Sequence, residues 1–247
     1  MIRAGVAALL LLLATAAAGD PVHCQNHEYA GNGYAVCIVD AENADLRLFL
    51  RDDSGTVLGQ FSTIETALAV EGRKLAFAMN AGMYHSDRAP VGLYVENGNE
   101  EMRVISDSGP GNFGLLPNGV FCIRDDRADV FETLAFVDEA PECRHATQSG
   151  PMLVINGELH PRFLIDSTSR YIRNGVGTSA DGSRAVFVIS RNSVTFHEFG
   201  SFFRDALEIP NALYFDGNIS RLYAPVIKRK DLGFAMGPVV GVTVPRD

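Results

Sequence analysis

Short apolar runs alternate with turn-forming dipeptides along most of the chain. The runs at 91–95 and 102–105 flank Asn97-Gly98, and the run at 152–155 leads directly into Asn156-Gly157. Asn-Gly and Asp-Gly favour β-hairpins, because their two-residue turns need a positive φ at the central positions. Five Asn-Gly dipeptides begin at 32, 97, 118, 156 and 174, and two Asp-Gly dipeptides begin at 181 and 216. The pattern predicts a strand-rich chain with many hairpins.

Helical patterns are fewer. Ser62 and Glu65 have the spacing of a capping box, and the apolar positions after Ser62 repeat with helical period, so a helix is predicted that ends near Gly72. A second, shorter helix is predicted to begin at Ser201 and to stop at Pro210. Few helices and many hairpins predict an α+β fold of a single domain, with a mixed or antiparallel twisted sheet.

The first residues of the chain have the pattern of a secretory signal peptide. Arg3 precedes an apolar run at 4–13, and small residues follow at 16–18. We therefore expect residues 1–18 to be cleaved off and one domain to span residues 20–247. No later run approaches the length that crosses a bilayer, so no integral membrane segment is expected after cleavage. The expected location is the periplasm or the outside of the cell.

The four cysteines fit an exported protein. In an oxidising compartment an even number of thiols usually forms disulfides, and four cysteines allow three pairings. Of these we expect the two local pairs, Cys24 with Cys37 and Cys122 with Cys143. No metal site is predicted, because the sequence has no CxxC motif and its six histidines are scattered.

Charge and the one glycine-rich motif exclude two classes of partner. The formal net charge is −9, which argues against the broad basic surface of a nucleic-acid-binding protein. The segment from Gly109 to Gly114 matches GxGxxG, but Pro117, Asn118 and Gly119 prevent the helix that a dinucleotide site needs. We therefore predict a loop at this segment and no cofactor.

Polar and glycine-rich residues directly follow several of the apolar runs. Asn80 follows the run at 75–79, and Asp216 follows the run at 212–215. Side chains at strand ends can converge on one cleft, where rigid strands hold them in place. The simpler alternative is that each segment is only a turn, because Asn-Gly and Asp-Gly are also ordinary turn chemistry.

Seven short motifs occur in an order that resembles a known family. They are Asn80-Ala81-Gly82-Met83-Tyr84, Pro90-Val91-Gly92-Leu93-Tyr94, Gly111-Asn112-Phe113, Pro117-Asn118-Gly119-Val120-Phe121, Gln148-Ser149-Gly150-Pro151-Met152-Leu153, Arg173-Asn174-Gly175-Val176-Gly177 and Asp216-Gly217-x-x-Ser220. They are similar to the phosphodiester glycosidase family, to which the domain of the mannose 6-phosphate uncovering enzyme belongs, and to its bacterial secreted branch. The uncovering-enzyme branch has two glycines after the first Asn and after the last Asp, where this chain has Ala81-Gly82 and Gly217-Asn218. Its substrate preference is therefore not carried over.

The resemblance implies hydrolysis of the bond between the anomeric carbon of a sugar and a phosphodiester. The leaving group would be a phosphate monoester, which is a stable anion and needs less help from a general acid than an alkoxide does. The reaction needs a cation against the phosphate and a carboxylate near the anomeric carbon. The planar fork of Arg173 suits the first role, and Asp216 suits the second, as a base or as a nucleophile.

The other motif residues suit hydrogen bonding to sugar hydroxyls or phosphate oxygens, or stacking on a sugar. The substrate-binding residues that we expect are Asn80, Tyr84, Asn112, Gln148, Ser149, Asn174 and Ser220. Purely structural roles are the alternative: Arg173 can pair with a surface carboxylate, and Asp216 can be an ordinary first residue of a turn. A non-catalytic polysaccharide-binding protein, periplasmic or secreted, would use the same residues to hold a glycan without turnover.

Overall fold

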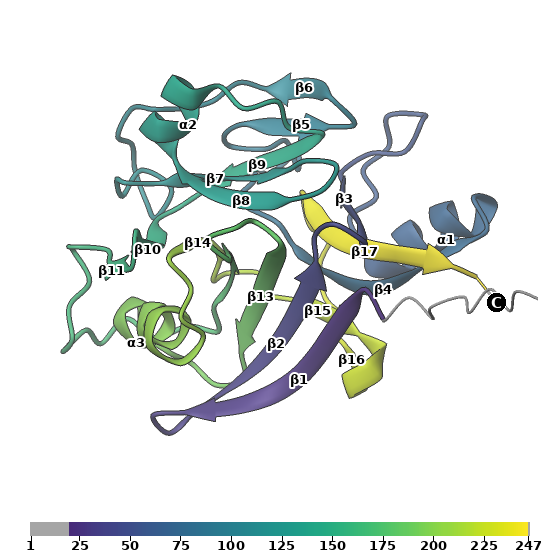
Figure 1. Ribbon diagram of the computed structural model, residues 1–247. Coiled ribbons are helices and arrows are strands. Elements are labelled where there is room, and N and C mark those ends of the chain that lie inside the picture. Colours follow the sequence, from purple (N-terminus) through teal and green to yellow (C-terminus); the bar gives the residue numbers. More distant parts are fainter. Residues whose placement is uncertain (1–19, 247) are drawn as a thin grey trace, which may run out of the picture.

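The computed structural model describes residues 20–246, which form three antiparallel sheets around a shared core (Figure 1). Every strand pair in these residues is antiparallel. The predicted α+β class with a hairpin-rich antiparallel sheet is confirmed, although the strands divide into three sheets. The signal peptide predicted at 1–18 lies outside the described residues.

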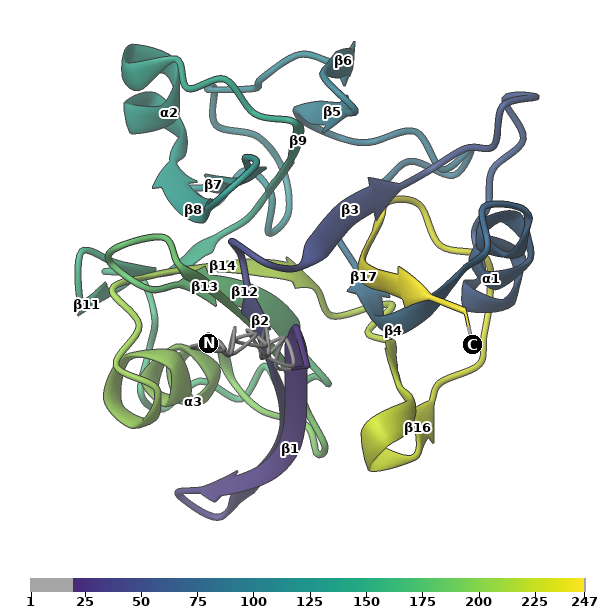
Figure 2. The same cartoon turned by 45° about the vertical axis from the view of Figure 1, so that its right-hand side comes forward.

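The sheets have seven, five and five strands. The first consists, in spatial order, of β1 (Val22–Tyr29), β2 (Asn32–Asp40), β13 (Arg184–Ser190), β12 (Asn174–Thr178), β14 (Asn211–Asp216), β10 (Met152–Ile155) and β11 (Glu158–Leu159). The second consists of β16 (Arg229–Lys230), β15 (Leu222–Ala224), β4 (Arg73–Asn80), β17 (Val239–Pro245) and β3 (Asp45–Phe49). The third consists of β6 (Asn99–Met102), β5 (Tyr94–Glu96), β9 (His145–Ser149), β7 (Gly119–Ile123) and β8 (Ala128–Glu132). Figure 2 shows the third sheet above the other two.

One aromatic cluster joins the three sheets. Phe77 of β4, Phe121 of β7, and Phe187 and Phe215 of the first sheet are all fully buried. The ring centroids of Phe77 and Phe187 lie 4.8 Å apart, and those of Phe121 and Phe187 lie 5.7 Å apart with perpendicular planes. Such pairs add about 1 kcal/mol each to what their buried area contributes. The three sheets therefore share one core.

The first predicted helix is present, but its cap is not the predicted one. Helix α1 (Phe61–Val70) begins after Gln60 and has no side-chain cap. Glu65 does not reach back to the start of the helix, because its carboxylate accepts the backbone N–H of Leu75 in β4. A tertiary hydrogen bond thus replaces the local capping box.

The second helix starts earlier than predicted. Helix α3 (Phe196–Ser201) is opened by a capping box between Thr195 and Glu198, and a π-helical turn, η1 (Phe202–Ala206), continues it. The predicted start at Ser201 was wrong because Thr195 supplies the stronger cap. No helix in residues 20–246 is long and apolar enough to cross a membrane.

Two further short helices were not predicted. Helix α2 (Thr133–Glu139) lies beside β7 and β8 (Figure 1), and the Glu132 carboxylate caps it by accepting two backbone N–H groups. It ends at Ala140 in the left-handed conformation, a position at which a glycine would have signalled the end of a helix. The 3-10 turn η2 (Pro225–Ile227) connects β15 and β16.

Some of the turn dipeptides form turns and others do not. Asn97-Gly98 and Asn156-Gly157 have positive φ at both residues and close the hairpins β5–β6 and β10–β11, as predicted. The dipeptides at Asn32 and Asn174 were wrongly read as turns, because each begins a strand. Gly175 is needed for close packing, since a Cβ there would lie 2.4 Å from the carbonyl oxygen of Leu213.

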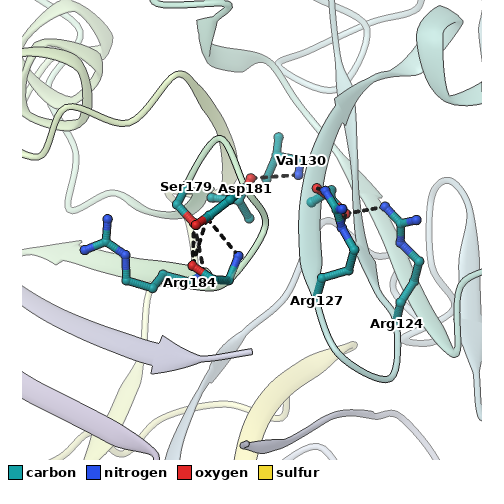
Figure 3. Close-up of polar contacts among 9 residues, drawn as sticks. Arg124, Arg127, Val130, Ser179, Asp181 and Arg184 are labelled. Carbon is teal, nitrogen blue, oxygen red and sulfur yellow. Dashed lines mark hydrogen bonds and ion pairs between the residues drawn. The ribbon is translucent and has the colours of Figure 1, made fainter. Parts of the chain in front are cut away.

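The turn between β12 and β13 is held by a side-chain network (Figure 3). The carboxylate of Asp181 accepts hydrogen bonds from the hydroxyls of Ser179 and Ser183, and these bonds lower its pKa. Beside it, the Thr178 hydroxyl accepts the N–H of Val130 at 3.1 Å, which ties the third sheet to the first. The Arg184 side chain extends away from this network into solvent (Figure 3).

Both expected disulfides are present. Cys24 and Cys37 are directly opposite each other on β1 and β2, and Cys122 of β7 is joined to Cys143 just before β9. No cysteine in residues 20–246 is free. By the loop-entropy estimate, each bond stabilises the folded chain by about 3 kcal/mol.

We expect the buried His145 to make the folded state sensitive to acid. Its ring is fully buried on β9, its Nδ1 accepts the N–H of Asn97, and its Nε2 has no partner among residues 20–246. Burial, with smaller contributions from Arg144 and Arg47, lowers its pKa to about 4. The unfolded chain, with an ordinary pKa of about 6.5, binds the proton first as the pH falls. The free energy of unfolding should therefore decrease by about 3 kcal/mol between pH 6.5 and 4.

Urea unfolding at pH 7.5 and at pH 4.5 measures this decrease. His145→Gln removes the titrating ring, so its free energy of unfolding should change less between the two pH values than that of the unmodified protein. The same substitution at exposed His23 serves as the control and should retain the full change. An unaltered change in His145→Gln would assign the acid sensitivity to other groups.

Candidate active site

A cavity of about 700 Å³ opens where the ends of β4, β12 and β14 meet. Its wall is built from residues of the segments 83–85, 110–113, 169–173 and 214–219, from Val91, and from Phe196 at the start of α3. Arg173 and Asp216 both line it, so the structure brings together the two residues expected to carry the chemistry. The 109–114 segment is a loop, as predicted, and borders the same cavity.

Arg173 is a buried cation without a carboxylate partner in residues 20–246. Its side chain is 1% exposed; Nε donates to the carbonyl of Val194 at 3.0 Å and Nη2 to that of Ser169 at 3.1 Å. The guanidinium carbon lies 3.6 Å above the ring of Phe196. Nη1 has no hydrogen-bond partner in this part of the chain, and burial lowers the Arg173 pKa. The surface ion pair considered as an alternative is therefore not formed, and one donor of the fork is unused.

Asp216 is the last residue of β14 and begins a tight turn. Its carboxylate accepts the backbone N–H groups of Gly217 at 2.6 Å and Asn218 at 2.8 Å. Burial raises the Asp216 pKa, and the backbone hydrogen bonds only partly oppose this effect. Asp216 thus begins a turn, as the simpler alternative predicted, and it is also a desolvated carboxylate on the cavity wall.

Tyr84 and Tyr214 interact electrostatically with the Asp216 carboxylate. Burial raises the pKa of Tyr84 and Tyr214, and the negative charge of Asp216 adds to both shifts. The nearby charge of Arg173 acts on Tyr214 in the opposite direction. The Tyr214 hydroxyl is therefore a neutral hydrogen-bonding group that interacts with both proposed catalytic charges.

The expected substrate-binding residues Asn80 and Asn174 lie behind the cavity wall. The Asn174 side-chain amide donates to the Asn80 Oδ1 at 2.8 Å, and both residues are fully buried. Asn80 Oδ1 also accepts the N–H of Arg221, while Asn174 Oδ1 accepts the N–H of Asp216. The Ser220 hydroxyl donates to the carbonyl of Asp216 at 2.9 Å and closes the turn. These amides join β4, β12 and β14 and so position Arg173 and Asp216.

Gln148 and Ser149 also bond inside the protein, and neither lines the cavity. Gln148 Oε1 accepts the N–H groups of Leu93 and Ile105, and its Nε2 donates to the carbonyl of Ile105. The Ser149 hydroxyl donates to the carbonyl of Phe215 at 3.0 Å. Both side chains are buried, and they anchor the segments that flank the site.

Tyr84 and Asn112 do line the cavity, together with three aromatic residues that the sequence analysis missed. The missed residues are Tyr171, Phe196 and Tyr214, which surround the Arg173 guanidinium. A signal for one of them existed, because Tyr214 precedes Asp216 by two positions and lies on the same face of β14. Clusters of three or more potential metal ligands do not occur in residues 20–246.

The family model for phosphodiester glycosidases matches residues 73–236. The chain belongs to this family. The matched segment contains all the cavity-lining residues, from Met83 to Ile219. The order of motifs in the sequence therefore identified the family correctly.

This phosphodiester glycosidase family member is similar to one protein in sequence and to others in structure. The chain is 33% identical over 216 residues to the uncharacterized protein YigE of Escherichia coli K12, covering 87% of this chain and 83% of YigE. The zebrafish N-acetylglucosamine-1-phosphodiester alpha-N-acetylglucosaminidase catalytic domain, auto-inhibited by its pro-peptide, has a similar fold, with a TM-score of 0.61, 13% identity and coverage of 90% and 81%. A hypothetical protein from Synechocystis gives a TM-score of 0.59, 13% identity and coverage of 91% and 62%.

Removing the Tyr214 hydroxyl should lower activity without a comparable loss of stability. Tyr214→Phe keeps the buried ring but deletes a polar group that interacts with Arg173 and Asp216, so kcat/KM in the hydrolysis proposed below should fall about tenfold. Tyr223→Phe, in a half-buried tyrosine outside the cavity, is the matched control. A lower Tm with unchanged kcat/KM in Tyr214→Phe would show that the hydroxyl serves packing alone.

Proposed function

We propose that this protein is a hydrolase that cleaves a sugar-1-phosphodiester in a cell-envelope or extracellular glycan. The observation that carries the proposal is the pairing, on one cavity wall, of an arginine without a carboxylate partner and a carboxylate whose pKa is raised. This combination suits a substrate that presents a phosphate anion beside an electrophilic carbon. Membership of the family supports the same reaction class.

Arg173 would bind the phosphodiester. Its Nε and Nη2 are occupied by backbone carbonyls, which hold the plane of the guanidinium against Phe196. The remaining donor, Nη1, has no hydrogen-bond partner in residues 20–246 and would bond a phosphate oxygen. As the bond to the anomeric carbon breaks, charge grows on the phosphate, so this contact strengthens in the transition state.

Asp216 would act at the anomeric carbon. Its ionised carboxylate either removes a proton from the attacking water or attacks the carbon itself. In either case the sugar–oxygen bond breaks, and the phosphate monoester leaves with the bonding electron pair. If Asp216 is the nucleophile, water then hydrolyses the glycosyl–Asp216 ester and releases the sugar. Tyr84 and Asn112 would contact the sugar or the phosphate, whereas Asn80, Gln148, Ser149, Asn174 and Ser220 would support the site from behind.

The two disulfides support a periplasmic or secreted location, where the substrate glycan would also be found. Release of free sugar from a panel of sugar-1-phosphodiesters, including cell-envelope polymers, tests the function. Release of a sugar together with a phosphate monoester from at least one member supports it. Binding of these compounds with no release from any of them would favour the non-catalytic polysaccharide-binding protein instead.

A further inference from the structure

A second pocket lies beside the candidate active site. It has a volume of about 510 Å³ and shares Gly217 and Asn218 with the cavity that contains Asp216. Arg191, Arg221 and Arg229 also line it, and we call it the arginine pocket. The turn that carries Asp216 therefore separates two adjoining pockets, one on either side.

The arginine pocket is positively charged although the whole chain carries a net charge of −9. Asp231 is the single acidic residue among its described lining residues, and it pairs with Arg229 at 2.9 Å. Glu28 pairs with Arg191 at 3.3 Å, but both side chains are about half exposed or more, so water weakens this pair. Arg221 has no ion pair within residues 20–246. The lining thus has an excess of positive charge.

Arg221 is a buried guanidinium with unused donors. It is 5% exposed, and its Nη1 donates to the side-chain oxygen of Gln60 at 3.1 Å. Its Nε and Nη2 find no hydrogen-bond partner in residues 20–246. A buried cation with unsatisfied donors is costly unless an anion joins it. Its backbone N–H is held by Asn80, the same residue that supports the active site.

We propose that the arginine pocket binds a second phosphate group of the substrate. The planar fork of a guanidinium matches the oxygens of a phosphate, and the Ser190 and Asn218 side chains at the pocket provide further polar groups. The substrate class is then a chain with repeating sugar-phosphate units, of which one phosphodiester lies at Arg173 and a neighbouring one at Arg221. This assignment rests on the proposed function for the reaction in the first cavity.

Substrates with one and with two phosphodiester groups test the proposal. We expect kcat/KM to be about tenfold higher for the two-phosphate compound, because one charged hydrogen-bonded contact contributes about this factor. Arg221→Gln and Arg191→Gln should each bring the ratio of the two kcat/KM values closer to one. Arg191 is exposed, so its variant keeps the test valid if Arg221→Gln does not fold. Arg184→Gln changes the net charge equally at an exposed position and should leave the ratio unaltered. A ratio near one in the unmodified protein would overturn the proposal.

Calorimetric titration with inorganic pyrophosphate separates this proposal from the proposed function. We expect pyrophosphate affinity to fall about tenfold in Arg221→Gln and Arg191→Gln, and binding at the arginine pocket to persist in Arg173→Gln. If no substrate is cleaved but binding still depends on Arg221, the function fails and the anion site stands. If binding depends on Arg173 alone, or if Arg221 binds pyrophosphate without changing the substrate ratio, the second-phosphate assignment is overturned.

Discussion

Replacing Asp216 by Asn should lower kcat/KM on a sugar-1-phosphodiester on the order of a thousandfold or more. Asn has nearly the same shape and can still accept the N–H groups of Gly217 and Asn218, but it is neither a base nor a nucleophile. Substrate affinity should change little, because the lost interaction belongs to the transition state. The measurement is kcat and KM on a substrate from which release of free sugar has been verified.

Stability should not fall in the same variant. The folded-state pKa of Asp216 is raised above the unfolded value by burial, so ionisation at neutral pH disfavours the folded state. A neutral Asn removes this cost, and the Tm should stay level or rise. Asp53→Asn, at an exposed carboxylate outside the cavity, is the matched control for both measurements. Near-normal turnover by Asp216→Asn would overturn the mechanism and favour the binding-protein alternative.

The raised pKa of Asp216 also sets the direction of the pH dependence. Only the ionised carboxylate can act, so kcat/KM should fall as the pH decreases through the raised pKa. This acid limb should lie above the pKa of about 4 of an ordinary Asp. The residual activity of Asp216→Asn should lack the limb, and its persistence there would assign it to another group.

Replacing Arg173 by Lys should lower kcat/KM by about tenfold to a thousandfold although the positive charge is kept. The guanidinium bonds the carbonyls of Val194 and Ser169 and still has Nη1 free. A single ammonium group cannot satisfy both carbonyls and also bind the substrate in the same plane. Some stability should be lost too, about 1–3 kcal/mol, because Lys cannot replace both hydrogen bonds of the buried guanidinium or its contact with the Phe196 ring.

Arg184→Lys, at an exposed arginine whose side chain points into solvent (Figure 3), is the control for this substitution. Arg173 and Asp216 would serve one transition state, so the double variant should be barely less active than Asp216→Asn alone. Turnover of Arg173→Lys equal to that of the unmodified protein would show that charge is sufficient at this position. Fully additive losses in the double variant would show that the two residues act in separate steps.

The sequence by itself determined the class of fold, the hairpins at Asn97 and Asn156 and the family, and it favoured the local cysteine pairs. These features depend on neighbours in the chain. Asn and Gly adopt a positive φ more readily than other residues, and ordered motifs identify a family without any distances. Arg173 and Asp216 stand in those motifs, so the two charges of the candidate site were also selected from the sequence.

Tertiary structure decided how the polar residues are used. Asn80 and Asn174 are 94 positions apart, and only the meeting of β4 with β12 turns them into an amide pair behind the cavity. The same long-range packing engages Glu65 with β4, and brings Tyr171, Phe196 and Tyr214 around Arg173. Burial, which leaves Arg221 and Arg173 with unused donors and raises the pKa of Asp216, exists only once three sheets enclose these groups. The sequence identifies the charged groups, but their desolvation and their unsatisfied hydrogen bonds exist only in the folded chain.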